Sequence, residues 1–280
     1  MKNFIWWTNS SNCSNCFFAV YFERLINKIK IGVIHQLIGV PLVTIISFFV
    51  GILALAPIGM LIPYGLNLGF LWATKNEIAK YIFNPLFGLM LPWMVVTGVI
   101  QVFVVMNLQQ FTIYQATTIM PMFTQLNIAV ATSVLSLSIL NRKNKELQKN
   151  AIPAYLIAFI GGSTEPALFG VSLRFVFPVI AASIGTALGI VITTASGVVA
   201  TMGNASLLIF LSVIPNANTT AFNLTTWPGT CYLWMAIAMV VTFGTTFLLT
   251  MIFASFGKYK KSTQEILNRD FTKVAEIINN

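Results

Sequence analysis

The chain is poor in charged residues. Asp, Glu, Lys and Arg make up 8% of its 280 residues, and only seven residues are acidic. A soluble domain usually has about 25% charged residues, so this composition excludes an ordinary water-soluble fold. The hydrophobic fraction is 57% and the mean hydropathy is +0.83. We therefore expect an all-α integral membrane protein, because an isolated helix satisfies its own backbone inside lipid.

Metal-ligating side chains are scarce as well. The chain has three cysteines and one histidine. Cys13 and Cys16 form a C-S-N-C spacing, but a structural zinc site needs about four ligands. Only Cys231 and His35 remain as further soft ligands. We expect unpaired thiols near the N-terminus, and neither a metal nor a cofactor.

The few charges lie in clusters that separate three long apolar tracts. Residues 31–74 and 81–141 contain no charged residue, and residues 150–257 contain two. Each intervening cluster has more Lys and Arg than Asp and Glu, which by the positive-inside tendency places all of them on one cytoplasmic side. We expect two membrane crossings in each of the first two tracts and two to four in the third. The net charge of +9 then reflects loops beside anionic membrane lipid, and we do not expect nucleic-acid binding.

This pattern divides the chain into three regions. Residues 1–16 are an atypical N-terminus, residues 17–257 are a polytopic helical bundle, and residues 258–280 are a cytoplasmic tail. Within the second apolar tract, the stretch 90–107 carries Gln101 at its centre, a polar group that must find a partner away from lipid. A basic loop, residues 141–150, is expected to be a solvated turn. The last span is expected over residues 231–256.

One carboxylate, Glu165, stands inside the third apolar tract in the stretch GGSTEPALFG. A charge near the bilayer centre costs about 2.5 to 3.5 kcal/mol on insertion scales, and such residues are mostly functional. The alternative is an ion pair between Glu165 and Arg174 that holds two segments together. Buried ion pairs contribute little net stability, so we favour the functional interpretation.

The neighbours of Glu165 predict a broken helix. Only about ten apolar residues precede Gly161, fewer than the roughly 20 that span a bilayer. Gly161 and Gly162 permit unusual backbone angles, and Pro166 disfavours the α conformation at Glu165. Irregular backbone at membrane depth persists only where it is buried in protein or lines a cavity. We therefore expect a re-entrant segment that lines an intramembrane binding site.

The chemistry of that site favours a neutral polyol. A carboxylate accepts two charge-assisted hydrogen bonds, and adjacent sugar hydroxyls are suitably spaced donors. An anionic substrate would be repelled. A proton-coupled carrier can also use a single glutamate, so chemistry alone leaves both possibilities open.

The run GGSTEPALFGVSLRFVFPVIAASIGTALG resembles the membrane subunit, enzyme IIC, of sugar phosphotransferase systems in the glucose superfamily. A G-[IVS]-T-E-P motif is a hallmark of that family. The continuation ALFGVSLR is similar to the trehalose, sucrose and β-glucoside branch, and most similar to its trehalose members. The resemblance extends from about Phe17 to about Pro215.

The resemblance implies a homodimeric, multi-pass permease of the bacterial cell membrane. Sugar would bind at Glu165, with Thr164 and Ser163 as neighbouring contacts. Rigid movement of one domain would carry the sugar inward, where a phosphocysteine on a cognate IIB domain phosphorylates it. The substrate would be trehalose or another disaccharide or β-glucoside.

The chain also departs from the family pattern. The family's G-[MV]-H-H motif is replaced by Gly98, Val99, Ile100 and Gln101, and of these only Gln101 can bond a sugar hydroxyl. The first several membrane segments of the family have no evident counterpart, which predicts an N-terminal truncation. The phosphorylating IIB cysteine is not expected in this chain. An inactive remnant and an ion-coupled sugar transporter therefore remain as alternatives.

Overall fold

The computed structural model describes residue 49 and residues 56–76, 78–142, 144–215 and 230–255. The predicted atypical N-terminus (1–16), the predicted tail (258–280) and the residues Cys13, Cys16 and His35 lie outside these ranges. The chain divides into two compact units. Within the described residues, the first unit holds 49, 56–70 and 101–109, and the second holds 71–100 and 110 onward.

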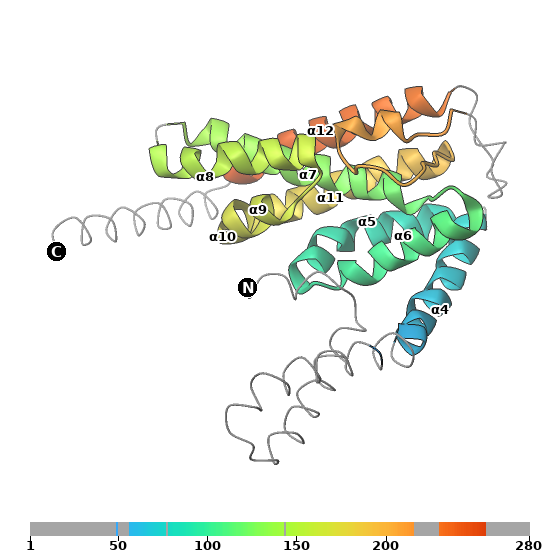
Figure 1. The fold of residues 1–280 in the computed structure, drawn as a ribbon. Coiled ribbons are helices and arrows are strands. Elements are labelled where there is room, and N and C mark those ends of the chain that lie inside the picture. The colour runs from blue at the N-terminus through green and yellow to red at the C-terminus, as the bar shows by residue number, and fades with distance from the viewer. Residues whose placement is uncertain (1–48, 50–55, 77, 143, 216–229, 256–280) are drawn as a thin grey trace, which may run out of the picture. The chain divides into compact units, whose positions relative to one another are not determined.

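The described secondary structure is helical, as the composition predicts (Figure 1). Outside the helices, the described residues form only two isolated β-bridges, Thr117 with Ala200 and Ala200 with Val213. The α-helices are α4 (Ala56–Lys75), α5 (Ala79–Thr97), α6 (Ile100–Tyr114), α7 (Ile119–Leu140), α8 (Lys145–Leu156), α9 (Glu165–Ala167), α10 (Leu173–Phe175), α11 (Phe177–Ala195) and α12 (Cys231–Ser255). The π-helices η4 (Ile157–Gly161) and η5 (Leu168–Ser172) and the 3₁₀-helix η6 (Leu207–Leu211) complete the set.

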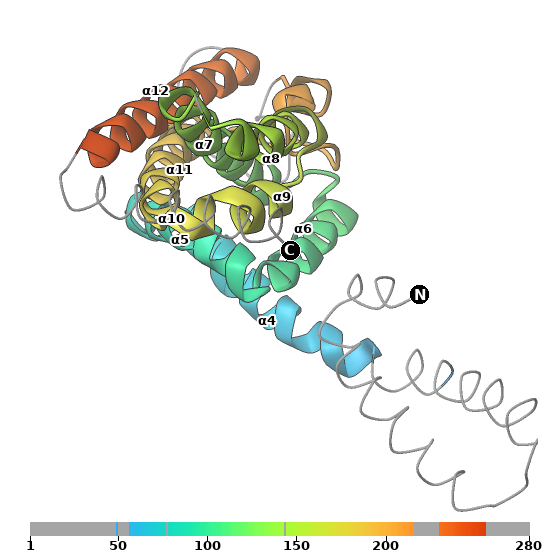
Figure 2. The ribbon, with the colours of Figure 1, turned by 90° about the vertical axis from the view of Figure 1, so that its left-hand side faces the viewer.

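Four of these helices are long and apolar enough to cross a membrane: α5, α7, α11 and α12. In the second unit, α11 packs against α5, α7 and α12, and α7 also packs against α8. Figure 2 shows α7 lying between α12 and α8. The most apolar window of α7 is 83% buried, against 28% for α12. Helix α7 is therefore the interior of the unit, whereas α12 presents an apolar outer face suited to lipid.

Small residues bring α11 and α12 into close contact. A Cβ atom on Gly185 would overlap Thr246, and one on Gly189 would overlap Thr242 Oγ1. The same Thr242 hydroxyl donates a 2.7 Å hydrogen bond to Gln125 Oε1 of α7. Close approach through small residues and interhelical hydrogen bonds are the usual means of helix association in lipid.

The stretch 90–107 is not one helix, because α5 ends at Thr97 and Gly98 adopts the left-handed conformation (φ 78°). Gln101 is the second residue of α6 and lies near a helix end. The structure corrects one predicted boundary. The expected turn over 141–150 is shorter: Asn144 accepts hydrogen bonds from the backbone N–H groups of Glu146 and Leu147, and α8 begins at Lys145. The predicted last span is confirmed by α12.

Candidate functional site

The stretch around Glu165 is a helix interrupted once by non-helical backbone and distorted on both sides. Helix α8 changes into the π-helix η4, which ends at Gly161. Residues 162–164 are not helical, and α9 then begins at Glu165 and leads into η5. Single π-helical turns within α-helices are frequent at functional sites. The predicted break at the charge is confirmed, while its re-entrant course through a membrane stays a prediction.

Of the two adjacent glycines, only Gly162 is required by the geometry. Its φ is +72°, and a Cβ there would overlap Asn204 Oδ1 and lie 3.2 Å from Ala205 O. Gly161 is the last residue of η4, and its Cβ would meet only Ile157 Cγ2, at 3.7 Å. The prediction that both glycines serve unusual backbone angles is therefore right for Gly162 alone.

Pro166 acts differently from the prediction. It was expected to keep Glu165 out of the α conformation, but Glu165 is the first residue of α9 and Pro166 occupies the first turn. Proline is tolerated there because the first N–H groups of a helix have no partner within the helix. The break lies just before Glu165, at residues 162–164.

The predicted sugar contacts differ in accessibility. Glu165 is exposed and Ser163 is half-buried, and the Ser163 hydroxyl donates a hydrogen bond to Glu165 Oε2. Thr164 is only 5% exposed, and its backbone carbonyl accepts a 2.9 Å hydrogen bond from Leu168 N. Ser163 and Glu165 therefore form the accessible part of the motif, and the Thr164 side chain is buried beneath it.

The remaining predicted residues lie on other elements. Arg174 is an exposed residue of α10, separated from Glu165 by the π-helix η5, and an ion pair with Glu165 stays the alternative hypothesis. Gln101 is exposed and belongs to the other compact unit. Its role as a sugar contact likewise stays a prediction.

Two asparagines that no sequence signal singled out hold the break. Asn127 of α7 is 5% exposed, and its Nδ2 donates to Gly162 O at 2.8 Å and also to Ala205 O. Asn204 Nδ2 donates to Ile160 O at 3.2 Å. Both amides bind backbone carbonyls beside the interruption of the helix.

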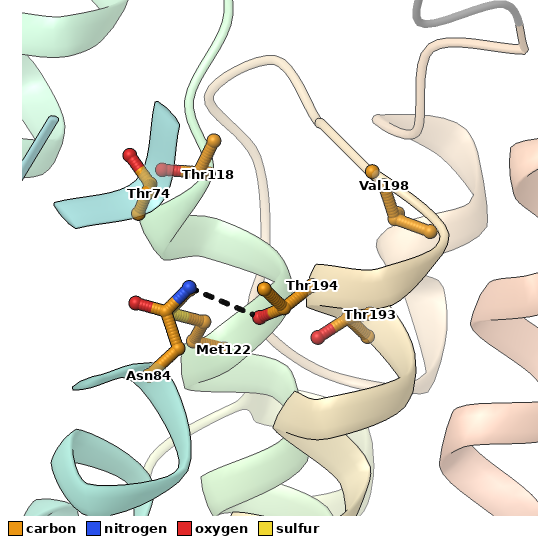
Figure 3. A pocket seen from close by; sticks show the side chains of 8 residues that line it. Thr74, Asn84, Thr118, Met122, Thr193, Thr194 and Val198 are labelled. Atoms are coloured by element: carbon orange, nitrogen blue, oxygen red, sulfur yellow. Dashed lines mark hydrogen bonds between the residues drawn. The ribbon is translucent and has the colours of Figure 1, made fainter. Parts of the chain in front are cut away.

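A small polar cavity lies elsewhere in the second unit (Figure 3). The cavity volume is about 20 Å³, enough for roughly one water molecule and too little for a sugar. Asn84 lines it and is fully buried; its Nδ2 donates to Thr194 Oγ1 at 3.2 Å, and its Oδ1 has no hydrogen-bond partner. The cavity lining consists of Thr74, Asn84, Thr118, Met122, Thr193, Thr194, Gly197 and Val198.

Comparison with curated proteins identifies relatives. The chain is 30% identical over 182 residues to the trehalose-specific EIIBC component of the phosphotransferase system of Escherichia coli K12. This match covers 64% of the chain and 38% of the relative. The sucrose-specific EIIBC component of Bacillus subtilis 168 is 30% identical over 175 residues, which are 61% of the chain and 37% of the relative. The chain is a relative of phosphotransferase-system EIIBC components.

A further EIIBC relative is named for other sugars. The arbutin-, cellobiose-, and salicin-specific EIIBC component of Escherichia coli K12 is 29% identical over 165 residues, covering 59% of the chain and 33% of that relative. The EIIBC matches cover between 33% and 51% of the relatives' own lengths. No protein-family model and no solved structure matches the chain.

The kinship confirms the resemblance that the T-E-P motif indicates, and with it the predicted class of protein. Taken with the four candidate spanning helices, the EIIBC kinship makes the chain a multi-pass protein of a bacterial cell membrane. Its activity, its sugar and its partners are matters of proposal, because the chain spans about half or less of each relative.

Proposed function

We propose that the chain is the sugar-binding and sugar-translocating part of a phosphotransferase-system permease. The observation that carries the proposal is the exposed Glu165 carboxylate at the break of the helix, oriented by the Ser163 hydroxyl. A charge in an apolar helical tract is costly, and a bound polyol would offset that cost with hydroxyl donors. The kinship with sugar-specific EIIBC components supports the same function.

For the sugar, we propose trehalose or another disaccharide or β-glucoside. The relatives are named for trehalose, for sucrose, and for arbutin, cellobiose and salicin, all of which contain a glucosyl unit. In this proposal, Glu165 accepts two adjacent hydroxyls of one glucosyl ring. The Ser163 hydroxyl then acts as a second polar contact beside the carboxylate.

For the partners, we propose a cognate IIB domain and a second copy of the chain. A IIB phosphocysteine would transfer its phosphoryl group to a hydroxyl of the bound sugar: the S–P bond breaks, an O–P bond forms, and the hydroxyl proton is released. Uptake and phosphorylation would thereby be coupled. The chain supplies binding and passage, and the IIB domain supplies the phosphoryl group.

The test is equilibrium binding of radiolabelled trehalose and sucrose to the purified full chain in detergent. We expect saturable binding that Glu165→Gln weakens by about 10- to 100-fold, the loss of a charge-assisted hydrogen bond. Glu146→Gln is the matched control, because Glu146 is an exposed glutamate in the first turn of α8, and it should leave binding unchanged. If neither sugar binds the unaltered chain, the proposal fails and the inactive-remnant hypothesis is preferred. If Glu165→Gln binds the sugars as tightly as the unaltered chain, the proposed role of Glu165 in the site is refuted.

A further inference from the structure

We propose that Asn127 is a positioning residue for Glu165: its side-chain amide replaces a backbone donor that Pro166 cannot supply. This inference rests on the proposed sugar site and adds the residue that fixes its geometry. Asn127 lies on α7, 38 positions before Glu165. It acts on the carboxylate through the backbone of the break.

The break leaves one backbone carbonyl without its helical donor. In a continuous α-helix, the carbonyl of Gly162 would accept from the N–H of the residue four positions later. That residue is Pro166, which has no N–H. Gly162 is half-buried; a carbonyl that is shielded from water and lacks a donor costs free energy comparable to a lost hydrogen bond, and the cost is higher in a membrane. Asn127 Nδ2 supplies the missing donor at 2.8 Å.

The same amide joins a second segment to the break. Asn127 Nδ2 also donates to Ala205 O, in the loop that precedes η6. From that loop, Asn204 Nδ2 returns a hydrogen bond to Ile160 O. Two amides thus connect α7, the break and the loop 204–205, and Asn204 fills the space that a Cβ on Gly162 would need.

The anchor is rigid because α7 is the interior helix. Leu126 and Ile128, the neighbours of Asn127, are 3% and 2% exposed. An amide fixed in such packing holds Gly162, and Gly162 is three residues before Glu165. Helix α7 therefore fixes the backbone from which the Glu165 side chain projects, and the Ser163 hydroxyl binds the carboxylate itself.

The first experiment compares sugar affinity with stability. Asn127→Ala removes the donor to both Gly162 O and Ala205 O and should weaken trehalose binding by about tenfold, an effect in the range of losing partly buried hydrogen bonds. Asn127→Ser, which keeps a short donor, should recover part of that loss. Thr132→Ala is the matched control, because Thr132 is a fully buried residue of α7 whose hydroxyl donates to Ile128 O within its own helix. It should change thermal stability without changing sugar affinity.

The second experiment does not depend on sugar binding. A spin label attached at Gly161→Cys, in a chain whose three native cysteines are replaced, reports the mobility of the break; Gly161 is exposed and has room for a side chain. Asn127→Ala should mobilise this label, whereas Thr132→Ala should not.

The two experiments separate the ways in which the proposals can fail. If the unaltered chain binds no sugar, the proposed function fails, and the spin label alone decides whether Asn127 anchors the break. The positioning role is refuted if the spin label stays immobile in the Asn127→Ala variant. It is also refuted if this variant binds sugar as tightly as the unaltered chain. An affinity loss that Asn127→Ser does not relieve, with an equal loss in Thr132→Ala, would show a merely structural role.

Discussion

Replacing Gly162 by alanine should destabilise the protein far more than the same change one residue earlier. The φ of +72° at Gly162 places any non-glycine residue in the left-handed region, which costs about 1 to 2 kcal/mol. The new Cβ would also overlap Asn204 Oδ1 and crowd the Ala205 carbonyl. Overpacking of this kind costs about 1 to 3 kcal/mol more. We expect a total loss of about 2 to 5 kcal/mol.

Gly161→Ala is the matched control. Gly161 does not have a positive φ, and its Cβ would lie 3.7 Å from Ile157 Cγ2, an ordinary contact. Replacing glycine by alanine at a compatible site stabilises by about 0.4 to 1 kcal/mol, because the unfolded chain loses freedom. The two neighbouring substitutions should therefore have opposite signs.

The assay is unfolding of the purified chain in mixed micelles, titrated with a denaturing detergent and followed by circular dichroism. Trehalose binding, measured on the folded fraction, should fall in Gly162→Ala because the segment that carries Glu165 shifts. Equal stabilities for the two variants would refute the reasoning. A Gly162→Ala variant with unaltered stability and trehalose binding would also refute the reasoning, because the left-handed turn would then not hold the break.

Two further predictions concern packing in the second unit, measured by the same unfolding titration. Gly189→Ala should cost about 1 to 3 kcal/mol, because the new Cβ overlaps Thr242 Oγ1. The double variant with Thr242→Ala should lose less stability than the sum of the two single losses. Additive losses would contradict the close contact. Asn84→Ala should cost about 1 to 3 kcal/mol, because it leaves a larger cavity and deprives Thr194 of its partner. Asn84→Leu fills that space and removes the unpaired Oδ1, so it should be closer to the unaltered protein; a Leu variant as unstable as the Ala variant would contradict this account.

Much of the membrane architecture is predictable from the sequence because lipid imposes simple rules. Long uncharged tracts must become helices, and the last of them was predicted as residues 231–256 and found as Cys231–Ser255. The break near Glu165 was predictable for the same reason, since a charge beside Gly162 and Pro166 is incompatible with an ordinary apolar span. The T-E-P motif then indicated the relatives that comparison found.

Sequence-based prediction fails where local signals compete. Pro166 can exclude the preceding residue from a helix or can open a helix in its first turn, and only the structure shows the second outcome. Gly98 can be an ordinary helical glycine in a membrane span or a left-handed terminator, and the structure shows the terminator. Both residues are compatible with either conformation locally, so contacts outside the local sequence decide.

The sequence by itself determined that this chain is a helical membrane protein with a costly carboxylate at a broken helix, because hydropathy and backbone chemistry act locally. The sequence also explains why the Gly162 carbonyl lacks its helical donor, since Pro166 has no N–H. Only the tertiary structure decided that Asn127, on a helix distant in sequence, supplies this donor, and that Gly162, unlike Gly161, must lack a side chain. Many polar side chains in the apolar tracts are capable of donating a hydrogen bond to Gly162 O, and the three-dimensional packing determines which of them reaches it.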